Sequence, residues 1–143
     1  MAYRDKFEVR IHTKSSPLTC KQIILYFKKI ISILPELKNY FITIAVINDL
    51  KMQELNRKFT GRNTSTDVLS FRYEGSIPTI EVIVSADQAV KNAPRYKNTP
   101  ARELLLYVIH GILHGLGYDD NDNKDRIKMF RKQREILNRV WNE

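Results

Sequence analysis

The sequence predicts an α/β (α+β) fold, with helices covering a mixed sheet of about four strands. Four short segments, 7–11, 40–47, 66–73 and 79–85, either alternate apolar and polar residues or form β-branched apolar runs, as strands do. Around these segments, apolar residues recur at helical spacing after polar residues that can cap a helix. Because the chain has 143 residues, we expect one domain over residues 1–143 with one hydrophobic core.

The first strand and the helix after it have clear periodic patterns. Residues 7–11 alternate apolar and charged side chains, as in a half-buried strand. Thr19 and Gln22 have the spacing of a capping box, in which each side chain bonds the other residue's backbone N–H. Apolar residues then recur at helical spacing until Pro35, which predicts a helix whose apolar face covers the sheet.

The middle of the chain predicts a second strand and a short helix. The apolar run YFITIAVI at residues 40–47 is typical of a strand buried on both faces. Asn48 or Asp49 can cap the helix that follows. By composition, residues 60–65 form a loop, and two further strands come after it.

Three helices are expected after the last strand. Ser85 and Gln88 have the spacing of a second capping box, opening a helix that Pro94 ends or bends near residue 93. Thr99 suits an N-cap, and a proline at the first helical position supports a helix over residues 100–115. This helix is apolar over most of its surface, so we expect it to be central.

The last helix begins after Asn121 or Asp122, either of which can cap it. Most of its basic residues lie away from one apolar side. That apolar side is predicted to contain Ile127, Phe130, Leu137 and Trp141.

The charge of the chain favours a polyanionic partner. The formal net charge is +8 and the isoelectric point is about 9.6. Lysine and arginine release condensed counterions when they neutralise phosphates, which makes RNA, and ribosomal RNA in particular, the expected partner. The alternative is that these residues, spread from Lys21 to Arg139, lie on solvated helix faces.

The N-terminus and the cysteine content favour the cytoplasm. Residues 1–12 lack the apolar core of a signal peptide, and two lysines interrupt the most apolar stretch, IILYFKKIISIL. We therefore expect no membrane association. The single cysteine, Cys20, agrees with a reducing compartment.

The segment HGILHGLGYDD predicts a site for one divalent metal ion. His110 and His114 are four residues apart on a predicted helix, so their rings lie on one face. Gly117 can adopt a positive φ and turn the chain back, which brings Asp120 to the same face. Two imidazoles and a carboxylate suit zinc. The alternative is that the histidines are core residues, that Gly117 only ends the helix and that the aspartate caps the next helix.

The spacing of these residues is metzincin-like, although zinc peptidases with this layout usually have His at the third position. In peptidases with the HExxH motif, the residue after the first histidine is the glutamate that acts as general base. Here that residue is Gly111, which disfavours a peptidase. Glycine inside a helix costs about 1 kcal/mol relative to alanine, so we expect either a substrate backbone or close helix packing beside it.

Three segments resemble the YbeY family of bacterial endoribonucleases. HGILHGLGYDD resembles the family's HGxLHLxGYDH, and LNRKFTGRNTSTDVLSF at residues 55–71 resembles LNxxYRxxxxPTDVLSF. IEVIVS at residues 80–85 occupies the place of the family's GDIVIS. The resemblance implies a zinc-type ion, endoribonuclease activity specific for single strands, and a part in ribosomal RNA maturation and ribosome quality control with ribosome-associated proteins. It implies no nucleotide cofactor.

Two departures from the family pattern concern the site itself. Asp120 replaces the third histidine, and Thr60 replaces the family's functional arginine. Arg62 in the same loop, or Arg57, can supply the missing guanidinium, and Arg62 is our candidate catalytic residue. The alternative is that both arginines are solvated surface charges. We also expect the basic residues Arg57, Lys58 and Arg62 to contact RNA.

These observations support one hypothesis and leave two alternatives. The first hypothesis is a metal-dependent endoribonuclease. The second is a non-catalytic protein that binds RNA or the ribosome and keeps the metal as a structural element, which Thr60 and Asp120 would explain. Hydrolysis of another substrate, such as a peptide, is the third and is disfavoured by Gly111.

Overall fold

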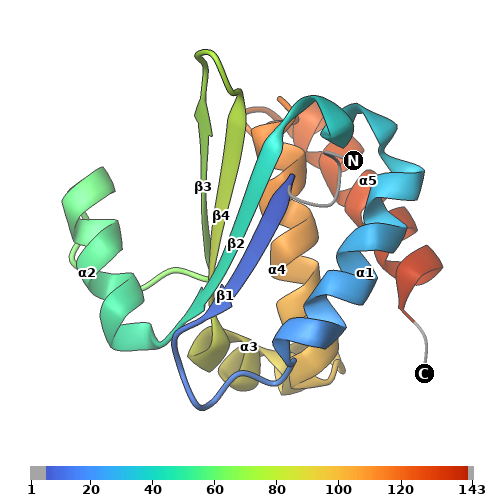
Figure 1. Cartoon of the computed structure of the whole chain (residues 1–143). Helices are drawn as coiled ribbons and strands as arrows, with labels where there is room; N and C mark the ends of the chain where they lie inside the picture. Colours follow the sequence, from blue (N-terminus) through green and yellow to red (C-terminus); the bar gives the residue numbers. More distant parts are fainter. Residues whose placement is uncertain (1–5, 142–143) are drawn as a thin grey trace.

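Four strands form one mixed sheet in the computed structural model, which describes residues 6–141 (Figure 1). They are arranged in the order β1-β2-β4-β3. β1, β2 and β4 run parallel, and β3 pairs antiparallel with β4 at one edge. The expected mixed α+β fold is therefore confirmed. The strands are β1 (Phe7–Ile11), β2 (Phe41–Ile47), β3 (Val68–Tyr73) and β4 (Thr79–Ser85).

Helices lie on both sides of this sheet, with α1, α4 and α5 on one side and α2 on the other (Figure 1). Within the described residues, no helix is both long and apolar enough to span a bilayer. The helices are α1 (Cys20–Ile33), α2 (Asp49–Thr60), α3 (Ala86–Asn92), α4 (Pro100–Gly115) and α5 (Asn123–Val140), with short 3-10 turns η2 (Pro35–Asn39) and η3 (Ala93–Tyr96).

The polar residues predicted to cap helices do so in most cases. The Thr19 hydroxyl accepts from the Gln22 backbone N–H at 3.1 Å, and the Gln22 side chain accepts from the Thr19 N–H at 2.8 Å. Asn48 caps α2, and the Thr99 hydroxyl caps α4 by accepting from the Arg102 backbone N–H at 3.2 Å. The helix starts were therefore encoded locally.

The second predicted capping box is only half formed. The Ser85 hydroxyl accepts from the Gln88 backbone N–H at 3.2 Å, as expected. The Gln88 side chain, however, donates to Asp49 Oδ1 at 2.9 Å and does not return to the Ser85 backbone. The Ser85 backbone N–H donates to the Asp67 carbonyl at 3.0 Å and is therefore not available to the Gln88 side chain.

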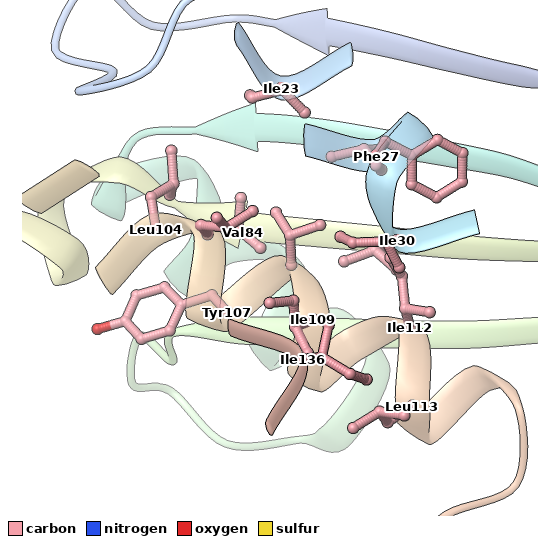
Figure 2. Packing of buried hydrophobic residues seen from close by; sticks show 14 of the residues in the cluster. Ile23, Phe27, Ile30, Val84, Leu104, Tyr107, Ile109, Ile112, Leu113 and Ile136 are labelled. Carbon is pink, nitrogen blue, oxygen red and sulfur yellow. The ribbon is translucent and has the colours of Figure 1, made fainter. Parts of the chain in front are cut away.

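The main core lies between the sheet and the helices α1, α4 and α5 (Figure 2). On β4, Ile80, Val82 and Val84 face this core, and Ile83 points to the other side of the sheet. α4 packs against β3, β4, α3 and α5, which confirms that it is the central helix. Its buried apolar residues include Leu104, Leu105, Val108, Ile109, Ile112 and Leu113.

The prediction that residues 40–47 are buried on both faces was wrong for one face. Phe41, Thr43 and Ala45 are only half-buried. The reason is that α2 covers this face only at the C-terminal end of β2, where Met52 packs in a small cluster with Ile47 and Ile83.

The predicted apolar side of α5 was also partly wrong. Ile127 and Phe130 are 56% and 48% exposed, because the helix turns a different stripe toward α4 and α1. The stripe includes a polar residue, Gln133, whose side chain bonds a residue of α4. The buried residues of α5 are Met129, Gln133, Ile136, Leu137 and Val140.

Two glycines let α4 lie close to the sheet. A Cβ at Gly111 would lie 2.6 Å from Val82 Cγ1, and one at Gly115 would lie 2.4 Å from Ile80 Cγ2. Of the two explanations for Gly111, close packing is therefore confirmed. This approach lets the Ser70 hydroxyl of β3 donate to the Gly111 carbonyl at 2.7 Å, which ties the edge strand to α4.

Candidate metal centre

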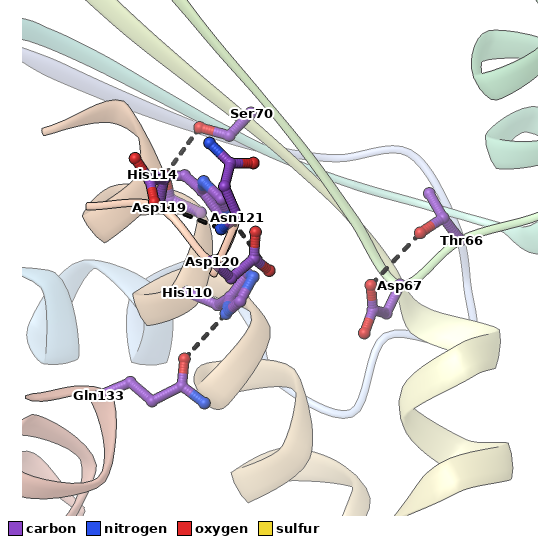
Figure 3. A network of polar contacts seen from close by, with 10 residues as sticks. Thr66, Asp67, Ser70, His110, His114, Asp119, Asp120, Asn121 and Gln133 are labelled. Carbon is purple, nitrogen blue, oxygen red and sulfur yellow. Dashed lines mark hydrogen bonds and ion pairs between the residues drawn. The ribbon is translucent and has the colours of Figure 1, made fainter. Parts of the chain in front are cut away.

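Two histidines of α4 and an aspartate from the following loop converge on one point (Figure 3). One potential ligand atom from each of His110, His114 and Asp120 lies within 4.8 Å of the others. The two imidazole centroids are 4.8 Å apart, and His114 Nε2 lies 3.9 Å from Asp120 Oδ2. This is the one cluster of its kind among residues 6–141, and it contains the three ligands predicted from spacing.

A glycine turn returns the aspartate to the helix face. Gly117 has φ +107°, a conformation that L side chains rarely adopt, and its N–H donates to the His114 carbonyl at 3.0 Å. The Tyr118 N–H donates to the Leu113 carbonyl at 3.0 Å, so the end of α4 is closed by the turn itself.

Asp122, and not Asp120, begins the last helix. Its side chain accepts from the Asp125 backbone N–H at 2.8 Å, which is the bond of an N-cap. The side chain of Asp120 has no role as a cap and is 46% exposed on the side of His114. The capping alternative for Asp120 is therefore wrong.

The ring of His110 is fixed from the opposite side. Its Nδ1 lies 2.8 Å from the side-chain oxygen of Gln133 on α5 (Figure 3). Because a carbonyl oxygen can only accept, Nδ1 carries the hydrogen and Nε2 keeps its lone pair for a metal. A second group that orients a ligand in this way is a common feature of metal sites. Nothing local in the sequence indicates this contact.

The lowered pKa of His114 also suits a metal ligand. Burial lowers the pKa of His114, and the neighbouring His110 lowers it further. Asp120 and Asp119 raise this pKa, but the net change is downward. The neutral imidazole that a metal ion requires is therefore favoured at neutral pH.

The donor set fits zinc or a similar ion. Zinc binds imidazole nitrogen at about 2.0–2.1 Å and carboxylate oxygen at about 2.0–2.2 Å, and catalytic sites commonly use three protein ligands. Ligand atoms within 4.8 Å of one another need only a small closure to share one ion. Asp120 is 46% exposed, so an ion held there would be accessible from solvent to a fourth, non-protein ligand.

An open cavity of about 450 Å³ lies beside this cluster, between α4 and the edge strand β3. Arg72 contributes the one basic side chain that lines it. Its Nε forms an ion pair with Glu74 at 2.7 Å, its Nη1 donates to the Gly115 carbonyl at 3.3 Å, and its guanidinium lies over the Tyr40 ring. The lining residues are Thr66, Asp67, Val68, Leu69, Ser70, Arg72, His110, Gly111, His114 and Gly115.

Arg72 was not among the site residues predicted from the sequence, although a signal for it was present. Val68, Ser70 and Arg72 are two residues apart on one strand, so their side chains share a face. Ser70 belongs to the TDVLSF segment, which resembles the family's motif. The two-residue spacing identifies Arg72 as a site residue only once α4 is known to pack against this face of β3.

The basic residues predicted to contact RNA lie elsewhere. Arg57 and Lys58 are in the last turn of α2, Arg62 follows it in the loop, and none of them lines the cavity. All three are exposed, and α2 stands on the other side of the sheet from α4 (Figure 1). The Thr60 hydroxyl donates to the Asn56 carbonyl of its own helix at 2.7 Å.

Taken together, the fold and the cluster define a single-domain α+β protein with a candidate three-ligand metal centre beside a cavity. A family model described as Endoribonuclease YbeY matches residues 6–141. The chain therefore belongs to the YbeY family of endoribonucleases.

Individual relatives agree with this assignment. A protein of Thermodesulfovibrio yellowstonii named Endoribonuclease YbeY is 31% identical over an alignment of 156 positions, gaps included, that covers 96% of this chain and 98% of the relative. The protein of that name from Bacillus licheniformis is 34% identical over 111 residues, covering 68% of this chain and 70% of the relative. The solution structure of TM1509 from Thermotoga maritima has a TM-score of 0.69 and 29% identity, covering 94% of this chain and 89% of that one.

Proposed function

We propose that this protein is a metal-dependent endoribonuclease that cleaves single-stranded RNA in the cytoplasm. Its proposed roles are ribosomal RNA maturation and ribosome quality control, with ribosome-associated proteins as further partners. The relatives named Endoribonuclease YbeY and the net charge of +8 support an RNA substrate. The observation that carries the proposal is the convergence of His110, His114 and Asp120 beside an open cavity.

The three ligands would hold the ion, which we propose to be zinc. When bound, the ion supplies Lewis-acid polarisation of a phosphate oxygen. Gln133 holds His110 in the tautomer that leaves Nε2 free, and Gly117 places Asp120. The carboxylate in place of a third histidine gives the ligand set one negative charge, which moderates the charge of the ion.

Arg72 is the cation best placed to contact a phosphate in the cavity. The ion pair with Glu74 and the contact with the Tyr40 ring hold its guanidinium, and its Nη1 is turned to Gly115. A guanidinium presents several N–H donors in a fixed plane, so a phosphate oxygen can be bound beside these contacts. In this proposal Arg72 braces the phosphate, and Arg62 remains a second candidate for the same role.

The test is a cleavage assay with a labelled single-stranded RNA and the corresponding duplex. Wild-type protein loaded with zinc should cleave the single strand, and His114→Ala, purified in parallel, should not. The parallel preparation shows whether a contaminating nuclease is present. Zinc-loaded wild type that leaves single-stranded RNA intact would contradict the proposal.

A binding protein without catalytic activity is the second candidate function. It is favoured by Thr60, whose hydroxyl is used within its own helix where the family has an arginine. In that case wild type would bind RNA or ribosomes in a salt-sensitive way without cleavage, and His114→Ala would bind equally well.

A further inference from the structure

A groove separate from the cavity runs between α4 and α5. The start of α4, the turn η3 and one side of α5 enclose about 290 Å³. A second hollow on the outer side of α5 shares Phe130, Arg134 and Asn138 with it, so the two form one continuous surface. We call this surface the α4–α5 groove.

Large apolar side chains are exposed along the α4–α5 groove. Tyr96 is 65% exposed, Phe130 is 48% exposed and Ile127 is 56% exposed. These residues come from two separate elements, η3 and α5, and line the same surface. Exposed aromatic rings of this kind provide faces on which nucleobases stack, largely without regard to sequence.

Three arginines lie among these apolar side chains. Arg102 donates to the side-chain oxygens of Asn98 and Asn138 at 3.2 and 2.9 Å, so its position is fixed by neutral partners. Arg131 and Arg134 project from α5 beside Phe130. No acidic side chain among residues 6–141 forms an ion pair with any of the three.

The acidic residues of the groove do not cancel this charge. Glu103 is 3% exposed and accepts a hydrogen bond from the Asn98 side chain at 2.9 Å. Glu135 stands on the outer hollow and is the one exposed acidic residue there. The surface thus combines cations with aromatic rings, which suits a single-stranded polyanion carrying bases.

One side chain separates the α4–α5 groove from the candidate metal centre. Gln133 lines the groove and bonds Nδ1 of His110. Leu106, another lining residue, precedes His110 on α4 by about one turn, or roughly 5.4 Å along the helix. A strand bound in the groove therefore lies on the Nδ1 side of His110, opposite the Nε2 that would hold the ion.

We propose that the α4–α5 groove binds single-stranded RNA on a surface separate from the cavity in which the bond is cleaved. Bases stack on Phe130 and Tyr96, and Arg102, Arg131 and Arg134 contact phosphates. The identity of the ligand rests on the proposed function, whereas the location of the surface rests on the groove itself.

The test measures binding of a fluorescently labelled 20-nucleotide single-stranded RNA to the full chain in EDTA, so that binding is separated from cleavage. Phe130→Ala should weaken binding at least fivefold, as removal of one stacking platform does. The double variant Arg131→Gln with Arg134→Gln should make the fall of log affinity with log salt less steep, by about 0.7 for each phosphate that is no longer neutralised. Both variants change exposed residues, and thermal melts will show whether they fold normally.

Matched controls separate these effects from general ones. Tyr73→Ala removes an aromatic residue that is 49% exposed on β3, and Lys128→Gln with Arg139→Gln removes two exposed basic residues of α5 outside the groove. Neither control should reduce RNA affinity as much as its groove counterpart.

The outcomes separate the groove from the nuclease function. If wild type cleaves RNA and the groove variants bind it as well as their controls, the groove proposal is wrong and the nuclease proposal stands. If the groove variants lose binding to ribosomal subunits but keep full affinity for free RNA, the surface binds protein and the proposal is also wrong. Wild type that neither binds nor cleaves RNA overturns both.

Discussion

His110 Nδ1 lies 2.8 Å from the side-chain oxygen of Gln133, so a residue of α5 sets the orientation of a candidate metal ligand on α4. Gln133 is only 9% exposed, in a stripe of α5 that is otherwise apolar. A polar side chain in such a position requires a partner, and His110 supplies it. The packing of α5 is thereby linked to the metal centre.

Removing this hydrogen bond should weaken metal binding without removing the ligands. Gln133→Leu should lower zinc affinity about 10–100-fold, as loss of an orienting partner does in other zinc sites. Competition with a chromophoric chelator measures the affinity, and Glu135→Leu on the exposed side of α5 is the control. Unchanged affinity in Gln133→Leu would show that the hydrogen bond does not orient the ligand.

The two neighbouring aspartates provide a matched test of the third ligand. Asp120→Ala should lose most of its bound zinc, whereas Asp119→Ala should keep it, because Asp119 is outside the cluster. Metal analysis after dialysis against a weak chelator gives the zinc content of each variant. Equal zinc content in the two variants would mean that the carboxylate of Asp120 is not a ligand.

A methyl group at Gly111 should destabilise the protein. Overpacking in a core costs about 1–3 kcal/mol, and the gain in helix propensity from glycine to alanine is about 1 kcal/mol. A Cβ at Gly111 would meet Val82 at 2.6 Å, so Gly111→Ala should lower the free energy of unfolding. In denaturant titrations, Gly111→Ala should cost less in a Val82→Ala background, and purely additive costs would argue against this clash.

The two candidate arginines can be compared directly. Arg72→Gln should reduce kcat/KM for RNA cleavage about 100-fold, similar to the loss of one transition-state donor. Arg72→Lys tests whether charge alone suffices, and thermal melts test whether packing against Tyr40 is disturbed. Arg62→Gln should change cleavage much less, because Arg62 does not line the cavity. The reverse order of effects would assign the role to Arg62.

Asp49 should make the stability of the fold depend on pH in the acid range. Partial burial raises its pKa, but hydrogen bonds from Ser65, Gln88 and Ser85 outweigh this effect, and the net pKa is lowered. A group with a lowered folded pKa stabilises the fold above its unfolded pKa, which is about 3.9, and this contribution is lost as pH falls through the folded pKa.

Asp49→Asn should therefore destabilise the protein at pH 7 by up to about 1 kcal/mol, because a neutral amide accepts these hydrogen bonds less strongly than a partly solvated carboxylate does. The difference from wild type should shrink as pH falls below about 4. Thermal melts from pH 7 to pH 3 measure this, with Glu54→Gln on the same helix as an exposed control. A difference that stays constant down to pH 3 would rule out the linkage.

Local sequence predicted most of the elements. The limits of these helices and strands depend on residues within a few positions, so they could be predicted. Examples are the alternation at residues 7–11, the caps at Thr19 and Thr99 and the break at Pro94. Predictions of burial were less accurate. The helical pattern of α5 was correct, but the choice of buried side was wrong for Ile127 and Phe130, because that choice depends on partners far away in sequence.

The metal cluster belongs to the part that the sequence determined by itself. Helical periodicity places His110 and His114 on one face, and Gly117 turns the chain back over only three residues to Asp120, so all three candidate ligands follow from local geometry. Only the tertiary structure placed Arg72 in the adjacent cavity and Gln133 against His110. Arg72 and Gln133 are both far in sequence from the α4 residues that they lie beside. The physical reason for these contacts is the packing of β3 and α5 against α4.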